Sequence, residues 1–468
     1  MHDRIKSASR RQIPAVSRVL DALGRCNLPR PFVVELVRRK LSQIRATTEI
    51  PKFESIVSSI RDSLDELRAS KLQPIVNGTG IVIHTNFGRA PLASDAVRAL
   101  SEIGSSYSNL EFDLASGERG VRAGYVETAL ALLCESESAT VVNNCAAALV
   151  LIATHFVREK LDGLKPSSFR ASKCEAIISR GELVQIGGGF RVGEILKASG
   201  AKLREVGATN KTALEDYARA IGPETAMIFK VHRSNFFMSG FVASPSSKEI
   251  SALARKKRIP FVEDLGSGAM IATESLGIAE HEPTPTEALR GGADLVCFSG
   301  DKLFGGPQAG VIVGRKRLVT ALKREPLFRA FRCDKLCLAA LQTTVNLHLD
   351  QKLGEIPALG LLQVSEEALR ARAVAIASRL TELPLEIAIR RGDAKTGGGT
   401  LPKSNMPSMT IDIVTRNSSL AEFAASLRAS NPPVIGYLAD NRFKLDLRTI
   451  FPTQDDLVIA AIRAVCTK

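Results

Sequence analysis

The sequence predicts an α/β protein whose central part is a mostly parallel β-sheet covered by helices. Between residues 74 and 325, short apolar runs of strand length alternate with helical patterns, which is typical of such a sheet. Before this region apolar residues recur at helical spacing only, and after it strands and helices are mixed. We therefore expect a small helical domain over residues 1–72, an α/β domain over 73–345 and an α+β domain over 346–468.

Three short helices are predicted for the first domain. Apolar residues at helical spacing mark the first two, namely Ile13, Val16, Val19, Leu20 and Leu23, and then Val33, Leu36, Val37 and Leu41. Pro29 and Pro31 separate these two helices, and the third covers residues 53–67.

The first domain also carries most of the positive charge. Its first 45 residues hold 11 Lys and Arg against three acidic residues, an excess of 8 out of a formal net charge of +14. A polyanionic partner would account for an excess of this size, and nucleic acid is the first candidate. Arg38, Arg39 and Lys40 fall on the second predicted helix and are the candidate nucleic-acid contacts. A merely hydrated basic helix face is the alternative.

Six apolar runs in the α/β region are short enough to be strands. They cover residues 140–142, 176–178, 226–231, 258–262, 295–298 and 310–313. Helical patterns lie between most of them, as at 146–158 and 247–257. The last run follows its predecessor after a turn, so we expect it to be an antiparallel addition to the sheet.

The last domain is predicted to mix both kinds of element. A helical stretch over 335–348 continues through 366–381. Strands are expected at 408–414, 434–436 and 443–447, and helices at 420–427 and 455–465. The glycines at 397–399 lie in a polar stretch and are interpreted as a turn rather than a phosphate-binding loop.

Composition narrows the class of protein. Hydrophobic residues make up 45% and charged residues 24% of the 468 residues, as in ordinary globular proteins. No apolar stretch approaches the roughly 20 residues that span a bilayer, and residues 1–11 lack the apolar core of a secretory signal. The eight cysteines show no CxxC spacing, so we expect reduced thiols and no metal site. A cytoplasmic protein is the expectation.

The strongest chemical signal is a lysine at the end of a buried strand. Lys302 follows the run at 295–298 among small residues, where desolvation should lower its pKa and supply the free amine for Schiff-base chemistry. A hydrated lysine in a loop is the ordinary alternative. One strand-and-helix unit upstream, another apolar run ends in Asp264. A lysine that forms an aldimine and an aspartate that faces the pyridinium nitrogen are the pair that pyridoxal 5′-phosphate (PLP) requires, so the sequence predicts a PLP enzyme.

Eight segments, in order along the chain, carry a resemblance to a known family. They are VNGTGIVIHTNFGRAPL (76–92), NLEFDLASGERGVR (109–122), VVNNCAAALV (141–150), SRGELVQIGGGFR (179–191), GAKLREVGATNKT (200–212), FKVHRSNFFMSGF (229–241), EDLGSGA (263–269) and FSGDKLFGGPQAG (298–310). With them the chain closely resembles the bacterial selenocysteine synthases, the L-seryl-tRNA(Sec) selenium transferases, nearly end to end. The resemblance implies a fold-type-I PLP-dependent transferase that assembles as a ring of dimers and binds tRNA through its N-terminal domain.

The resemblance also implies a reaction and its catalytic residues. Seryl-tRNA(Sec) becomes selenocysteinyl-tRNA(Sec) through a PLP aldimine, β-elimination of water and addition of selenium to aminoacrylyl-tRNA, with selenophosphate as donor. Lys302 matches the PLP lysine and is the natural base for the Cα proton. Asp264 matches the partner of the pyridine nitrogen. Asp301 matches the acidic neighbour of the lysine and is a candidate for proton transfer at the hydroxyl, with a purely structural role as the alternative.

Further site residues follow from the same resemblance. Arg89, Arg329 and Arg332 match basic residues associated with the donor anion, whose oxygens suit the planar guanidinium fork; ordinary ion pairing is the alternative. The cofactor-binding candidates besides Lys302 and Asp264 are Asn144, Cys145, Ala146, Arg180 and Ser299. The first three lie where a helix start can hold a phosphate with backbone N–H groups, and Arg180 is expected to cover the cofactor ring.

Two other functions fit part of the pattern. A PLP-dependent lyase or aldolase of the same fold would act on a free amino acid or amino sugar, but such relatives generally lack the N-terminal domain seen in residues 1–70. A non-catalytic tRNA-binding protein could keep the fold without the chemistry. The presence of Lys302, Asp264 and the arginines argues against it.

Overall fold

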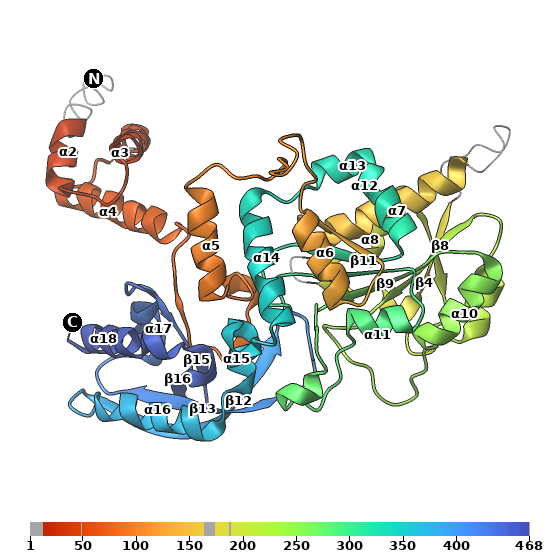
Figure 1. Ribbon diagram of the computed structural model, residues 1–468. Helices are drawn as coiled ribbons and strands as arrows, with labels where there is room; N and C mark the ends of the chain where they lie inside the picture. The colour runs from red at the N-terminus through yellow and green to blue at the C-terminus, as the bar shows by residue number, and fades with distance from the viewer. Residues whose placement is uncertain (1–12, 48, 163–173, 187–188, 468) are drawn as a thin grey trace. The chain divides into compact units, whose positions relative to one another are not determined.

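The computed structural model describes residues 13–47, 49–162, 174–186 and 189–467 (Figure 1). The charged start considered above, residues 1–11, lies outside these ranges. The chain forms two compact units, one of Met1–Ile75 with Ala425–Val434 and one of Val76–Ala424 with Ile435–Lys468. Among the described residues, none of the helices combines the length and apolar composition that a bilayer-spanning segment requires. The domain boundaries at residues 72 and 345 stay predictions.

The three predicted N-terminal helices are confirmed. They are α2 (Val16–Leu23), α3 (Arg30–Arg45) and α4 (Phe53–Ala69). Pro29 caps α3 and Pro31 lies in its first turn, where the missing N–H of proline costs nothing. The apolar sides of the helices share one small core that includes Val19, Val37 and Ile60.

The central sheet of the larger unit has seven strands in the order β3-β11-β10-β9-β8-β4-β7. Their bounds are β3 (Ser138–Val142), β4 (Glu175–Ser179), β7 (Lys202–Val206), β8 (Thr225–Val231), β9 (Phe261–Gly266), β10 (Leu295–Ser299) and β11 (Gly310–Gly314). The β4–β7, β4–β8, β8–β9 and β9–β10 pairs are parallel. Strand β11 is antiparallel, as predicted, and it lies between β10 and β3.

Helices cover both faces of this sheet (Figure 1). They include α6 (Gly124–Leu133), α7 (Cys145–Asp162), α8 (Val192–Ala198), α9 (Leu214–Ala220), α10 (Ser247–Lys257), α11 (Pro285–Arg290), α12 (Lys316–Arg324) and α14 (Lys335–Leu349). Alternate residues of β10 serve the two faces: Leu295 and Cys297 enter one core cluster, and Val296 and Phe298 the other. A strand buried on both faces needs a continuous apolar run, which is why such strands are visible in the sequence.

Two predictions for this sheet need correction. The fourth strand was expected from residue 258, but Arg258 adopts a left-handed conformation (φ 56°) at the end of α10, and the strand starts at Phe261. Strand β7 was not predicted. It is an edge strand with exposed Lys202, Arg204 and Glu205, so it shows no apolar run.

The remaining chain forms a five-stranded sheet in the order β15-β16-β13-β12-β2. The strands are β2 (Ile81–Ile83), β12 (Leu385–Gly397), β13 (Met406–Thr415), β15 (Tyr437–Ala439) and β16 (Arg442–Asp446). The helices around it are α15 (Pro357–Gln363), α16 (Glu366–Ser378), α17 (Leu420–Arg428) and α18 (Asp455–Cys466). The predicted strands at 408–414 and 443–447 and the last two helices are confirmed, and the run at 434–436 forms the short strand β14 (Val434–Ile435).

Two features of this part differ from the prediction, and a third confirms it. The helical stretch expected from 335 to 381 is interrupted after Leu349, and Pro357 starts the separate helix α15. Strand β12 was missed because most of its residues are polar or partly exposed. The glycines at 397–399 all have positive φ values, and the Thr400 N–H donates to the Gly397 carbonyl, so the predicted turn is confirmed.

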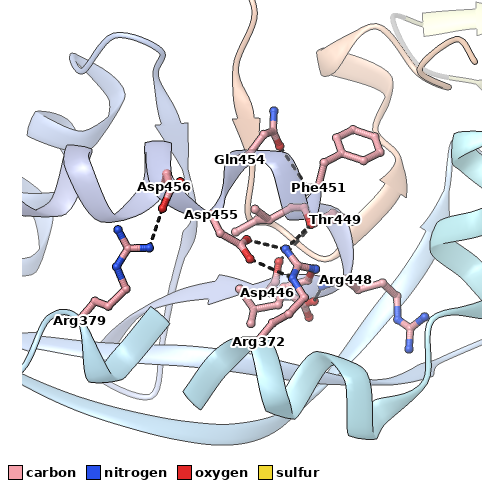
Figure 2. Close-up of polar contacts among 11 residues, drawn as sticks. Arg372, Arg379, Asp446, Arg448, Thr449, Phe451, Gln454, Asp455 and Asp456 are labelled. Atoms are coloured by element: carbon pink, nitrogen blue, oxygen red, sulfur yellow. Dashed lines mark hydrogen bonds and ion pairs between the residues drawn. The ribbon is translucent and has the colours of Figure 1, made fainter. Parts of the chain in front are cut away.

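An arginine from α16 fastens the connection between β16 and α18 (Figure 2). Arg372 donates from Nη2 to Asp455 Oδ1 (2.6 Å) and from Nε to Asp455 Oδ2 (3.1 Å). It also donates to the carbonyls of Leu447 (3.3 Å) and Ile450 (2.9 Å). One half-buried guanidinium therefore satisfies four acceptors in a segment with little regular structure.

Arg372→Ala should lower the free energy of unfolding by about 3 kcal/mol, because it leaves the half-buried Asp455 without its partner. The neighbouring Arg379 is a matched control, since its pair with Asp456 is exposed (Figure 2). Arg379→Ala should change the stability by no more than about 0.5 kcal/mol. Urea titration followed by circular dichroism measures both. Equal losses in the two variants would contradict the assignment.

Candidate active site

Lys302 and Asp264 meet at the carboxyl edge of two neighbouring parallel strands. Asp264 is in β9, directly in register with Cys297 of β10, and Lys302 follows the end of β10. Both side chains are buried. A Cβ built on Gly266 would lie 3.7 Å from Lys302 Nζ and 4.0 Å from Asp264 Oδ1. The structure therefore brings the predicted lysine and aspartate together, beside a position that has no side chain.

Burial moves both groups toward their neutral forms. Desolvation lowers the pKa of Lys302, and the negative charge of Asp264 partly opposes this shift. Desolvation likewise raises the pKa of Asp264, and the Lys302 ammonium is the main opposing influence. A lysine with a lowered pKa supplies free amine near neutral pH, which is the form that attacks a carbonyl carbon.

Asp301 is held by Arg89 and keeps one oxygen free. Arg89 Nη1 lies 2.8 Å from Asp301 Oδ2, and the Ala90 N–H donates to the Asp301 carbonyl (3.2 Å). Asp301 Oδ1 is buried and accepts no hydrogen bond from any described residue. A buried acceptor without a partner is costly, so this oxygen is well suited to a ligand group that donates a hydrogen bond.

The start of α7, from Asn144 to Ala146, forms an anion-binding cradle close to Lys302 and Asp264. The Asn144 side chain caps the helix by accepting from the Ala147 N–H (2.8 Å), while the N–H groups of Cys145 and Ala146 have no partner within a helix. A Cβ on Gly310 would lie 2.2 Å from the Asn144 carbonyl oxygen, so only glycine allows β11 to pack here. This cradle can bind an anion such as a phosphate.

A cysteine ties the cradle to the aspartate. Cys145 Sγ donates to Asp264 Oδ1 (3.6 Å), and the thiols of Cys145 and Cys297 and the Asp264 carboxylate lie within 4.8 Å of one another. Cys297 was missed from the sequence. The only signal for it is its place in a strand that pairs with the strand of Asp264.

The three arginines predicted for the donor anion lie in different settings. Arg89 is paired with Asp301, and Arg332 Nη1 lies 3.4 Å from Glu111 Oε1. Arg329, on α13 (Pro326–Ala330), is exposed and makes no ion pair with any described residue. No hydrogen bond or ion pair within the described ranges joins Arg89 to the other two. The Asn143 N–H donates to the Phe331 carbonyl (2.9 Å), which holds the loop of Arg332 beside the α7 cradle.

Glu111 is the centre of an arginine cluster that the sequence analysis missed. It pairs with Arg119 (2.7 Å) and Arg122 (2.9 Å) as well as with Arg332. The hydrogen bond from Arg122 is the main cause that lowers the pKa of Glu111. Glu111, Arg119 and Arg122 all lie in the segment 109–122, but only the fold shows that they surround one carboxylate.

The other predicted site residues are placed as follows. Arg180 follows β4, is 52% exposed, and pairs with Glu205 (3.2 Å) instead of contacting Lys302 or Asp264. Ser299 is buried at the end of β10. In the helical unit, Arg38 and Arg39 are exposed on α3, and Lys40 is half-buried.

Comparison with known proteins identifies the family. The model of the family described as L-seryl-tRNA selenium transferase matches residues 75–451. This chain belongs to the L-seryl-tRNA selenium transferase family. The L-seryl-tRNA(Sec) selenium transferase of Geotalea daltonii is 42% identical over 97% of this chain and 99% of its own length. That of Aquifex aeolicus is 39% identical over 94% and 95%, respectively.

The solved structure of D-glucosaminate-6-phosphate ammonia-lyase is similar in fold. It covers 85% of this chain and 96% of its own, with a TM-score of 0.57 and 19% sequence identity. At that identity the likeness concerns the fold alone. The predicted fold-type-I transferase fold of this selenium transferase family member is confirmed.

Replacing the central carboxylate of the arginine cluster tests its electrostatic role. Glu111→Gln removes the negative charge that neutralises Arg119, Arg122 and Arg332, so inorganic phosphate should bind more tightly, by on the order of tenfold. Isothermal titration calorimetry measures the affinity. Glu135→Gln, which frees only the exposed Arg290, is the matched control and should leave phosphate affinity unchanged. Weaker binding by Glu111→Gln would mean that Glu111 positions the arginines instead.

A further buried carboxylate, Glu182, lies where β4 ends. Glu182 accepts from the Val231 N–H (3.1 Å) and so links the ends of β4 and β8. Burial raises its pKa from 4.5 to about 7, against the hydrogen bond from Val231 and the charges of Lys230 and Arg233. Between these two pH values the folded protein holds a proton that the unfolded chain releases.

This carboxylate should therefore make stability fall as the pH rises from about 4.5 to about 7, by at most about 3 kcal/mol. Glu182→Gln should remove this component. As the pH rises from 5 to 8, the variant should therefore become more stable relative to the unsubstituted protein. Urea titrations at both pH values measure the difference. Glu205→Gln, at an exposed position, should show no such gain; a pH-independent effect of Glu182→Gln would contradict the raised pKa.

Proposed function

We propose that this enzyme converts L-seryl-tRNA(Sec) into L-selenocysteinyl-tRNA(Sec), with PLP as its cofactor and selenophosphate as the selenium donor. The observation that carries the proposal is the buried pair of Lys302 and Asp264 in a member of the L-seryl-tRNA selenium transferase family. The relatives that cover nearly the whole chain are named L-seryl-tRNA(Sec) selenium transferases, which supports the choice of substrate.

The residues present fit PLP. Lys302 would bind the aldehyde carbon and Asp264 the ring nitrogen, while the backbone N–H groups of Cys145 and Ala146 would hold the phosphate. Two glycines leave the space: Gly266 lacks a side chain between Lys302 and Asp264, and Gly310 allows the close approach at the cradle. When bound, PLP supplies an electron sink that acidifies the seryl Cα–H.

Each neighbouring residue then has a defined task. Lys302, as free amine, accepts the proton from the seryl Cα, and its buried position keeps competing water away. Asp301 Oδ1 accepts a hydrogen bond from the seryl hydroxyl, while Arg89 fixes the other oxygen. The hydroxyl would leave the β-carbon as water, with the proton that Lys302 took from Cα. Selenium of the donor would then bond to the β-carbon while Cα regains a proton, and attack of water on the donor would break its P–Se bond and release phosphate.

Charged residues elsewhere are proposed to bind the two anionic substrates. Arg89, Arg329 and Arg332 would hold the oxygens of selenophosphate, since guanidinium groups match them in shape and charge. Arg38, Arg39 and Lys40 of α3 would contact the tRNA backbone. Residues 1–72 would then be the tRNA-binding domain, 73–345 the catalytic domain and 346–468 the small C-terminal domain of a cytoplasmic ring of dimers.

Lys302→Ala should abolish the visible absorbance of the lysine-linked cofactor and lower the rate of selenocysteinyl-tRNA(Sec) formation by at least on the order of 10³-fold. Borohydride treatment of the unsubstituted protein should fix the cofactor to Lys302, as read by peptide mass spectrometry. Lys230→Ala is the matched control, because Lys230 is a half-buried lysine that pairs with Glu263 and lies on β8, the strand next to that of Asp264.

The visible absorbance of the lysine-linked cofactor also tests which substrate the enzyme uses. Seryl-tRNA(Sec) should perturb it, and free serine and seryl-tRNA(Ser) should not. A response to free serine or an amino sugar without one to the tRNA would favour a lyase or aldolase. If the protein takes up no PLP at all, the proposed function fails.

A further inference from the structure

The loop that follows β8 borders the catalytic lysine. It begins where the His232 N–H donates to the Asp264 carbonyl (2.8 Å). Two residues later, Ser234 Oγ lies 3.8 Å from the position of a Cβ on Gly266, the same point that lies 3.7 Å from Lys302 Nζ. Phe237 is three residues further, so its Cα lies within about 10 Å of that of Ser234.

This loop exposes two large aromatic rings. The Phe237 side chain is 53% exposed and the Phe241 side chain 85%. In contrast, Phe236, which precedes them in the sequence, packs against the core of the sheet. The backbone that carries the rings is anchored. Asn235 Nδ2 donates to the Gln185 carbonyl (2.7 Å), and Asn210 Nδ2 donates to the Phe241 carbonyl (2.6 Å). Exposed aromatic rings on an anchored backbone suit a flat ligand, because an aromatic side chain has few rotatable bonds and loses little conformational entropy on binding.

Lysines flank both rings. Lys403 Nζ lies 5.1 Å from the ring centre of Phe237, and Lys211 Nζ lies 5.5 Å from that of Phe241. Neither ammonium makes an ion pair with a described residue, although the backbone N–H of Lys403 donates to Glu280. In addition, Asn235 Oδ1 is buried and accepts no hydrogen bond from any described residue. The loop therefore offers stacking surfaces, positive charge and an unused acceptor.

We propose that Phe237 and Phe241 stack with the unpaired 3′ nucleotides of the aminoacyl-tRNA, and that Lys211 and Lys403 hold the phosphates between them. The proposal rests on the proposed function, in which a seryl ester on the 3′-terminal ribose must reach Lys302. Because Ser234 Oγ and Lys302 Nζ border the same point, the nucleotides attached to that ribose must lie near the loop that follows β8. Aromatic rings interleaved with basic residues are the usual platform for unpaired nucleotides.

The test compares intact tRNA(Sec) with the same tRNA trimmed of its unpaired 3′ nucleotides, using the PLP-loaded full chain. Trimming should weaken binding to the unsubstituted enzyme by on the order of tenfold. In the double variant Phe237→Ala with Phe241→Ala, both tRNAs should bind alike. Phe237→Tyr keeps a ring and should retain the dependence on the 3′ end. Leu438→Ala, at a 53% exposed apolar position of β15, is the matched control and should also retain it.

Other outcomes separate this inference from the proposed function. If the double variant keeps the tenfold dependence, or loses affinity equally for both tRNAs, the stacking platform is overturned while the proposed function stands. A changed oligomeric state of the double variant would make these rings an interface between copies, which also overturns the inference. If the unsubstituted enzyme binds no tRNA(Sec), the proposed function and the inference fail together.

Discussion

The burial of Lys302 beside Asp264 is the interaction on which the site depends. A lysine and an aspartate are taken out of water at the end of two strands, which is costly unless each compensates the other. Parallel pairing of β9 and β10 meets this need, because parallel strands end at one edge and bring their carboxyl-terminal residues together. The apolar strands around the pair provide the low dielectric that shifts both pKa values, so the fold and the reactivity of the lysine have the same cause.

The antiparallel strand β11 couples the lysine to the anion cradle. It returns from the Lys302 turn and pairs with β10 on one side and with β3 on the other, with Gly310 opposite Ser299 and Val142. The α7 cradle begins immediately after β3. Hence the spacing between the amine and the cradle is set by ladder hydrogen bonds rather than by a flexible loop, and a ligand that bridges the two meets a fixed distance.

The sequence predicts buried elements better than exposed ones, because burial restricts which residues an element can contain. The inner strands and the positions of Lys302 and Asp264 were predictable, because a strand covered on both faces must be apolar until its end. Strands β7 and β12 were not, since exposed or half-exposed strands carry charged residues and lose the pattern. The pairing of Glu111 with Arg332, 221 residues apart, and the outward pairing of Arg180 with Glu205 are set by tertiary contacts that local spacing does not encode.

The cations proposed to bind the two anionic substrates differ in whether they already have a carboxylate partner. Arg89 and Arg332, near the buried pair, each have a carboxylate partner, so they present little net field to a distant polyanion. Lys211 and Lys403, like Arg38 and Arg39 on α3, make no ion pair with a described residue. Under the proposed function, long-range attraction of the tRNA would therefore be concentrated on the unpaired residues. Under the same proposal, a small anion would reach the paired arginines only by competing with Glu111 or Asp301. This competition would favour a compact, highly charged oxyanion over a backbone phosphate with one negative charge.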